Sequence, residues 1–126
     1  MKKTIYLILI LLSFQSCNGQ LECSDLINGK FELNSENGTT VIERKGNTQI
    51  EKFDGLTYYS DVVWITDCKY ELKNHRNDNG ELEKEELNSI YTVEIIEITK
   101  GFIKIRTTSN YSDKSLERTL KIIEIK

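Results

Sequence analysis

The sequence predicts an all-β domain, a small antiparallel meander of about seven or eight strands that forms either an up-and-down barrel or a sandwich. Two observations support this class. Apolar and polar residues alternate with a period of two along most of the chain after residue 28, and short dipeptides rich in Gly and Asn separate the alternating runs. The absence of proline and alanine also fits strands better than helices.

The first strands lie between residues 29 and 53. Phe31 and Leu33 alternate with charged neighbours, which indicates a strand with one buried face. Residues 39–45 and 48–53 then predict a hairpin around Gly46-Asn47, because this dipeptide tolerates the positive φ of tight hairpin turns.

The clearest alternation in the chain spans residues 62–72. Six residues share one face of this run, and mostly charged residues share the other. We expect a half-buried strand with its cysteine on the inward face. The six residues are Val62, Trp64, Thr66, Cys68, Tyr70 and Leu72.

The last third of the domain predicts a second hairpin and a closing strand. Residues 90–99 and 102–107 flank Lys100-Gly101, and residues 116–125 follow. The apolar parity changes between Ile122 and Ile123, which indicates a bulge or a strand buried on both faces. Only residues 80–88 have a weakly helical pattern.

The N-terminus has the layout of an export signal. Lys2 and Lys3 precede an apolar run, Ile5 to Leu12, that is too short to cross a bilayer, and a cysteine follows at position 17. We expect residues 1–16 to be a lipoprotein signal peptide, 17–28 a lipidated lead with the lipid on Cys17, and 29–126 a single β domain. Ordinary secretion, with cleavage after Gly19, is the alternative.

The cysteine count agrees with lipidation. Three cysteines are an odd number for an exported protein. If Cys17 carries lipid, Cys23 and Cys68 remain as one disulfide in an oxidising compartment.

Charge excludes some partners. The chain has a formal charge of −3, and removal of Lys2 and Lys3 with the signal makes it more negative. We therefore expect no binding to nucleic acid and no electrostatic adhesion to anionic lipids, because both need a basic cluster. We expect the lipid on Cys17 alone to attach the protein to the membrane.

Motifs for catalysis or metal binding are weak. Residues 75–86 match a calcium loop in part, but His75 stands where the first acidic ligand belongs. A catalytic cysteine would need His75 as its base. Cys68 and His75 are seven residues apart, so along one continuous strand their side chains would lie on opposite faces and could not meet. Two thiols and one histidine supply too few ligands for zinc. We therefore predict no catalytic residue, no metal site, no cofactor and no enzymatic activity.

Aromatic residues are the remaining candidates for a site. They could line a ligand pocket, although such residues more often fill a core. The set is Tyr58, Tyr59, Trp64, Tyr70, Tyr91 and Phe102. From these and from the first strand we select Phe31, Trp64 and Tyr70 as core or pocket residues.

Several segments resemble known families. Gly29-Lys30-Phe31 resembles the Gly-x-Trp opening of lipocalins, with Phe in place of Trp. Together with Cys23, Arg44, Gln49-Ile50-Glu51 and the segment from Trp64 to Tyr70, it makes residues 17–125 similar to a family of short, uncharacterised lipoproteins of Bacteroidota. Some members bear a DNA topoisomerase IV label, which an exported acidic domain of this size does not support.

The resemblance implies a place in the cell envelope. Asn18-Gly19-Gln20 lacks the acidic cluster associated with surface display in that group, which favours the periplasmic side of the outer membrane. We expect a lipid-anchored, non-enzymatic domain that binds an unknown envelope protein or a small ligand. The alternatives are a lipocalin-like carrier of a small apolar molecule and, last, an enzyme.

Overall fold

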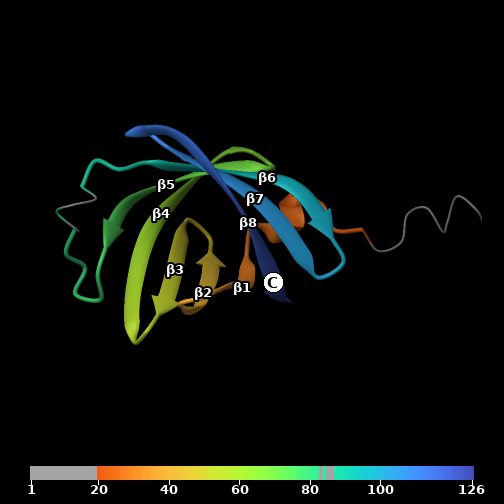
Figure 1. Ribbon diagram of the computed structural model, residues 1–126, viewed down its shortest axis with the longest axis horizontal. Helices are drawn as coiled ribbons and strands as arrows, with labels where there is room; N and C mark the ends of the chain where they lie inside the picture. The colour runs from red at the N-terminus through yellow and green to blue at the C-terminus, as the bar shows by residue number, and fades with distance from the viewer. Residues whose placement is uncertain (1–19, 83, 85–86) are drawn as a thin grey trace, which may run out of the picture.

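The chain forms a closed barrel of eight antiparallel strands in consecutive order, so the predicted all-β class is confirmed and the barrel replaces the sandwich (Figure 1). The computed structural model describes residues 20–126 except 83, 85 and 86, and the predicted signal peptide and Cys17 lie outside this range. The elements are η1, a 3-10 helix (Cys23–Leu26), β1 (Gly29–Ser35), β2 (Gly38–Lys45), β3 (Thr48–Phe53), β4 (Leu56–Thr66), β5 (Lys69–Arg76), β6 (Tyr91–Thr99), β7 (Phe102–Ser109) and β8 (Ser112–Ile125).

Local turn chemistry explains the hairpins. Gly46 and Gly101 have positive φ of 59° and 84°, as the dipeptides in these two turns predicted. The bulge near the C-terminus is also confirmed. Lys30 pairs with Glu124 while Phe31 pairs with Ile122, so Ile123 is the extra residue of β8.

The run from residue 62 to 72 is not one strand. It is the hairpin of β4 and β5, which turns at Asp67 and Cys68. Trp64 pairs directly with Tyr70, so both stay on the same face across the turn. The alternation therefore continues through the reversal of the chain, and the pattern alone gives no sign of it.

The predicted helical segment is also different. The described residues between 80 and 88 contain no α-helix, and Leu82 forms a bridge with Arg76 instead. The Asn77 side chain shapes the start of this loop, because its Oδ1 accepts hydrogen bonds from the backbone N–H groups of Asn79 and Glu81. These turns lie at the beginning of the segment for which a helix was predicted.

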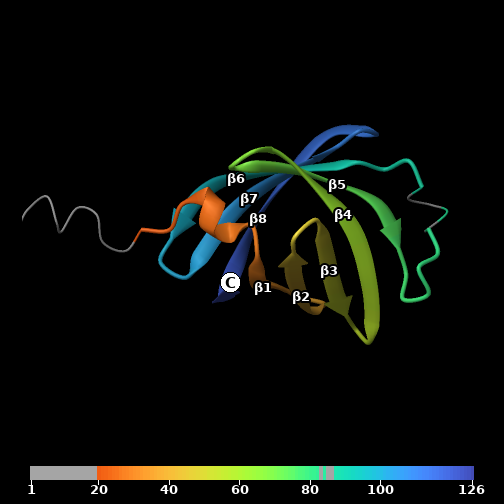
Figure 2. The same ribbon diagram turned by 180° about the vertical axis from the view of Figure 1, so that it is seen from behind.

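The barrel is sealed more fully at one end than at the other. At the end where β1 begins and η1 packs, β1 and β8 are paired up to Glu32 and Lys121. Beyond that point β8 pairs only with β7. Similarly, β5 and β6 pair up to Leu72 and Tyr91 only. We call the first end the closed end and the other the open end; Figure 2 shows η1 lying against the closed end.

The core lies at the closed end. The most deeply buried apolar side chains there come from η1, from the first strand and from the last two strands: Leu26, Phe31, Ile103 and Leu120. The predicted disulfide is present, and Cys23–Cys68 ties η1 to the turn between β4 and β5. The covalent bond therefore holds the helix over the end of the barrel.

We predict that the double variant Cys23→Ser, Cys68→Ser loses about 4 kcal/mol of unfolding free energy, because the bond closes a loop with a sequence separation of 45. Chemical denaturation of the wild-type and variant domains measures the loss. The wild-type protein should show no free thiol at either position before reduction. Two reactive thiols there, or an unchanged free energy, would contradict the prediction.

Candidate functional site

Arg44 is the largest fully buried side chain of the described chain, with 0% relative exposure, at the closed end. Its Nη2 donates a hydrogen bond of 2.8 Å to the Leu26 carbonyl of η1. Its Nη1 donates to Gln49 Oε1 at 3.2 Å and to the Tyr70 hydroxyl at 3.1 Å. Its Nε has no hydrogen-bond partner. One guanidinium thus joins η1, β3 and β5.

Aromatic rings enclose this cation. The guanidinium carbon lies 4.5 Å from the centroid of the Phe31 ring and 5.0 Å from that of Tyr70, within the range of cation–π attraction. The centroid of the Trp64 ring is 6.0 Å from it, and this ring packs at a tilt of 48° against that of Tyr70, with centroids 4.7 Å apart. The structure therefore places Phe31, Trp64 and Tyr70 together, around an arginine that the sequence analysis used only as a family motif.

The polar side of this cluster faces a cavity. Burial raises the pKa of Tyr70, so its phenol stays protonated at neutral pH. Gln49 accepts from Arg44 and donates from Nε2 to Glu51 Oε1 at 2.9 Å. A hydrogen-bonded chain therefore leads from the buried cation to the Glu51 carboxylate, and Gln49, Glu51 and Tyr70 all line the cavity.

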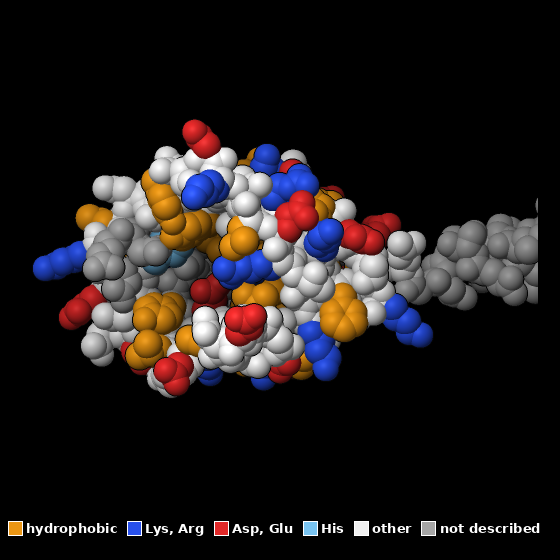
Figure 3. Space-filling view, viewed as in Figure 1, with side chains coloured by type: hydrophobic (Ala, Val, Ile, Leu, Met, Phe, Trp, Pro, Cys, Tyr) orange, Lys and Arg blue, Asp and Glu red, His pale blue; other side chains and the backbone are white. Residues whose placement is uncertain are grey.

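The cavity occupies about 680 Å³ inside the barrel. Figure 3 shows the hollowed face, with hydrophobic side chains around the hollow. Two kinds of side chain line it. Polar groups come mainly from β3 to β5, and aliphatic groups come mainly from β6 to β8 together with β1 and β2. The polar wall is Gln49, Glu51, Tyr58, Ser60 and His75; the aliphatic wall includes Leu33, Ile42, Val93, Ile105, Leu116 and Leu120.

Ser60 and His75 form a buried pair in the polar wall. The Ser60 Oγ and His75 Nδ1 are 2.7 Å apart, and His75 Nε2 lies 3.2 Å from the Ser89 carbonyl oxygen. Because a carbonyl oxygen only accepts, Nε2 carries the proton in this contact, and the Nδ1 of a neutral ring then accepts from the Ser60 hydroxyl. His75 therefore connects β4 to the segment before β6, where β5 and β6 no longer pair.

A bulge brings His75 into the barrel. Tyr59 pairs with Arg76 and Asp61 with Lys73, so β5 has one residue more than β4 between these pairs. Asn74 is one of the residues between these pairs, and its positive φ of 54° accommodates the extra residue in β5. The sequence analysis assumed one continuous strand and missed this change of face. The sequence signal that could have suggested this change is the Asn itself, because Asn adopts positive φ more readily than most residues.

An ion pair and a hydrogen bond, both to Asp61, stabilise the bulge on the outer face of the barrel. Asn74 Nδ2 donates to Asp61 Oδ2 at 2.7 Å, and Arg76 Nη1 lies 3.0 Å from Asp61 Oδ1. The Asn74 hydrogen bond, followed by that of Arg76, lowers the pKa of Asp61. The carboxylate therefore holds both residues that flank His75.

The segment at residues 88–90 is held from a second side. Asn110, in the turn between β7 and β8, donates from Nδ2 to the Asn88 carbonyl at 2.8 Å. Its Oδ1 accepts from the Ile90 backbone N–H at 3.1 Å. Beside it, the hydroxyls of Tyr91 and Tyr111 are 3.0 Å apart. Side chains therefore close the seam that strand pairing leaves open.

The predicted alternatives can now be placed. His75, the first position of the calcium-loop match, is a buried residue of β5 that contacts Ser60, so it is not placed as the first ligand of such a loop. Cys68 is in the disulfide. Of the aromatic candidates, Tyr58, Tyr70 and Tyr91 line the cavity, whereas Phe102 is exposed. No group of three or more His, Cys, Asp or Glu side chains suited to a metal occurs among the described residues.

A scan against protein-family models and a search of curated proteins found no match to this chain.

We predict that Arg44→Met lowers the free energy of unfolding by about 2–4 kcal/mol, because the Leu26 carbonyl, Gln49 and Tyr70 lose their buried donor. Arg106→Met is the matched control, since Arg106 pairs with Glu94 and Glu117 on the exposed surface and should matter much less. Urea denaturation of both variants measures the difference. Equal effects would contradict the role of Arg44.

Proposed function

We propose that this domain binds a small amphipathic molecule in its barrel cavity. The observation that carries the proposal is the cavity itself, whose volume of about 680 Å³ lies within the range of small-molecule sites, roughly 300–1,000 Å³. A domain that works only through a protein partner has no need of such a space. The cavity therefore favours a ligand-binding role over a protein-binding one.

The lining argues for a ligand that is not purely apolar. A molecule that filled the cavity with hydrocarbon would cover Gln49, Glu51 and Ser60 without offering them hydrogen bonds. Burial of polar groups without partners costs free energy. A ligand with one polar edge and one apolar face would satisfy both walls. This modifies the sequence-based alternative of a carrier for an apolar molecule.

We propose no reaction for the site. A serine beside a histidine is part of a hydrolytic arrangement, but such a site also needs donors aimed at the developing oxyanion. The Ser60–His75 pair has a structural use, since it ties β4 to Ser89 at the seam between β5 and β6. The proposed domain is accordingly a binding protein and not an enzyme.

The proposed location is the cell envelope, with Cys17 as the lipid anchor. It rests on the signal layout and on the resemblance to Bacteroidota lipoproteins, and it places the domain on the periplasmic side of the outer membrane. The Cys23–Cys68 disulfide supports an oxidising compartment. In the part of the chain that the structure describes, no helix is long and apolar enough to span a bilayer.

We predict saturable, one-to-one binding of N-phenyl-1-naphthylamine, a neutral probe whose fluorescence rises in apolar surroundings. Thr107→Trp should weaken this binding at least about tenfold, because Thr107 lines the cavity and the larger side chain would fill it. Thr108→Trp is the control, since Thr108 lies next in β7 and is exposed. Fluorescence titration measures both. No binding, or equal binding by both variants, would argue against a ligand in the barrel.

We predict that Cys17→Ser releases the protein from the membrane fraction, because the acyl chains are the proposed attachment. Cell fractionation and immunoblotting measure the distribution. The control is Cys23→Ser, which removes a cysteine but leaves the anchor. Unchanged membrane retention of Cys17→Ser would refute lipidation at this residue.

A further inference from the structure

Arg118 is a cation on the inward face of β8, near the open end. Its partner in β7 is Ile105, a buried residue of the barrel interior, and directly paired residues of antiparallel strands share a face. The Arg118 side chain therefore lies on the face of β8 that lines the 680 Å³ cavity, and it is exposed to solvent near the open end. No hydrogen bond or ion pair joins its guanidinium to another described side chain.

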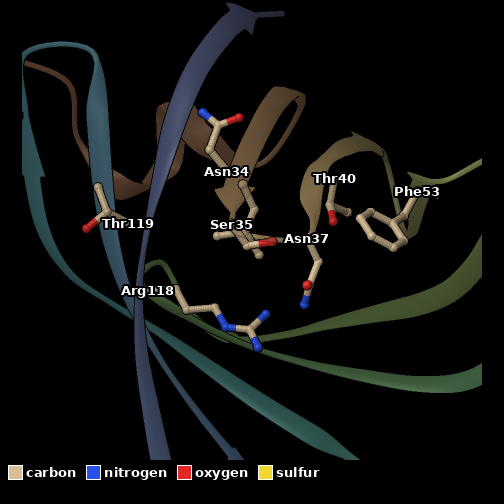
Figure 4. A pocket seen from close by; sticks show the side chains of 8 residues that line it. Asn34, Ser35, Asn37, Thr40, Phe53, Arg118 and Thr119 are labelled. Atoms are coloured by element: carbon tan, nitrogen blue, oxygen red, sulfur yellow. The ribbon is translucent and has the colours of Figure 1, made fainter.

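A second cavity of about 490 Å³ lies beside Arg118, where β1 and β8 are no longer paired. Figure 4 shows the Arg118 side chain extending from β8 toward Ser35 and Asn37. Leu33, Thr40 and Arg118 line both cavities, so the two spaces adjoin at the arginine. The other residues that line the second cavity are Asn34, Ser35, Asn37, Phe53 and Thr119.

The second cavity is suited to an anion. Five of its lining side chains carry neutral amide or hydroxyl groups, one carries a positive charge, and among these described lining residues there is no carboxylate. Amides and hydroxyls can donate hydrogen bonds to a bound oxyanion, and a guanidinium can donate two parallel hydrogen bonds to a carboxylate or phosphate. The neighbouring barrel cavity supplies the aliphatic wall.

The charges inside the barrel lead to the same conclusion. Arg44 and Glu51 carry opposite charges and are joined through Gln49 by hydrogen bonds of 3.2 and 2.9 Å. Both charged groups are thus engaged in hydrogen bonds to the Gln49 amide. Arg118 is a charged side chain lining the two cavities for which no such contact with another described side chain is present. A ligand with one negative charge would complete the site.

We propose that the ligand is an amphipathic anion, whose carboxylate or phosphate head binds Arg118 in the second cavity while its apolar body lies against the aliphatic wall of the barrel. This rests on the proposed function and names the chemical class of the ligand. The head would reach solvent through the gap between β1 and β8. The body would lie against Leu33, Ile105 and Leu120 on the aliphatic side, so that it would not cover Gln49, Glu51 and Ser60 on the polar wall.

The test uses three ten-carbon competitors against bound N-phenyl-1-naphthylamine: decanoate, decyl phosphate and 1-decanol. They share the apolar chain and differ in the head. We expect at least one of the two anions to displace the probe at a concentration about tenfold below that of 1-decanol, about 1.4 kcal/mol. The anion that displaces it at the lower concentration identifies the preferred head group.

Arg118→Gln should reduce this preference to about one, and a circular dichroism spectrum and an unfolding midpoint close to those of the wild type would show that the variant is folded. Arg106→Gln is the control, because Arg106 lies in β7 on the outer face and pairs with Glu117. A wild-type preference near one, or a preference that survives in Arg118→Gln, would overturn the assignment. Absence of saturable probe binding would instead overturn the proposed function, and this assignment with it.

Discussion

The burial of the Arg44 guanidinium is the constraint on which the closed end of the barrel depends. Among the described residues, no carboxylate lies within ion-pair distance of it, and removing a charge from water without such a partner costs several kcal/mol. Three hydrogen bonds and the faces of Phe31 and Tyr70 offset this cost. Together these contacts involve four elements, so η1, β1, β3 and β5 meet at one side chain. The disulfide then keeps η1 where its Leu26 carbonyl can accept from Arg44.

The open end has less strand pairing than the closed end, and both cavities extend toward it. Large side chains fill the closed end, whereas toward the open end the sheet parts along two seams, between β1 and β8 and between β5 and β6. The second seam is closed by His75 and Asn110, which bind backbone groups of residues 88–90. The first seam has the 490 Å³ cavity beside it. Continuous strand pairing thus surrounds the closed end, and the two cavities lie toward the end where pairing stops.

Sequence patterns predicted the parts of this fold that depend on neighbours along the chain. The turns at Gly46 and Gly101, the bulge at Ile123 and the pairing of Cys23 with Cys68 all follow from local residue chemistry or from counting thiols. The site was harder, because it depends on residues that meet across the barrel. Ser60 meets His75 only because Asn74 adopts positive φ and changes the face of β5. Arg44 looks like a surface residue until Leu26, Gln49 and Tyr70 are seen around it.

The net negative charge of the chain does not prevent it from binding an anion. Charges on the outer surface are separated by water and are screened beyond about 8–10 Å at physiological ionic strength. A ligand inside the barrel responds chiefly to the groups that touch it, where the effective dielectric constant is lower and hydrogen bonds to a charged donor are strong. Arg118 is the charged side chain among the described residues that line the second cavity, and it is exposed to solvent there. An acidic exterior would still disfavour adhesion to anionic lipid surfaces, while the proposed anion site depends on this one local arginine.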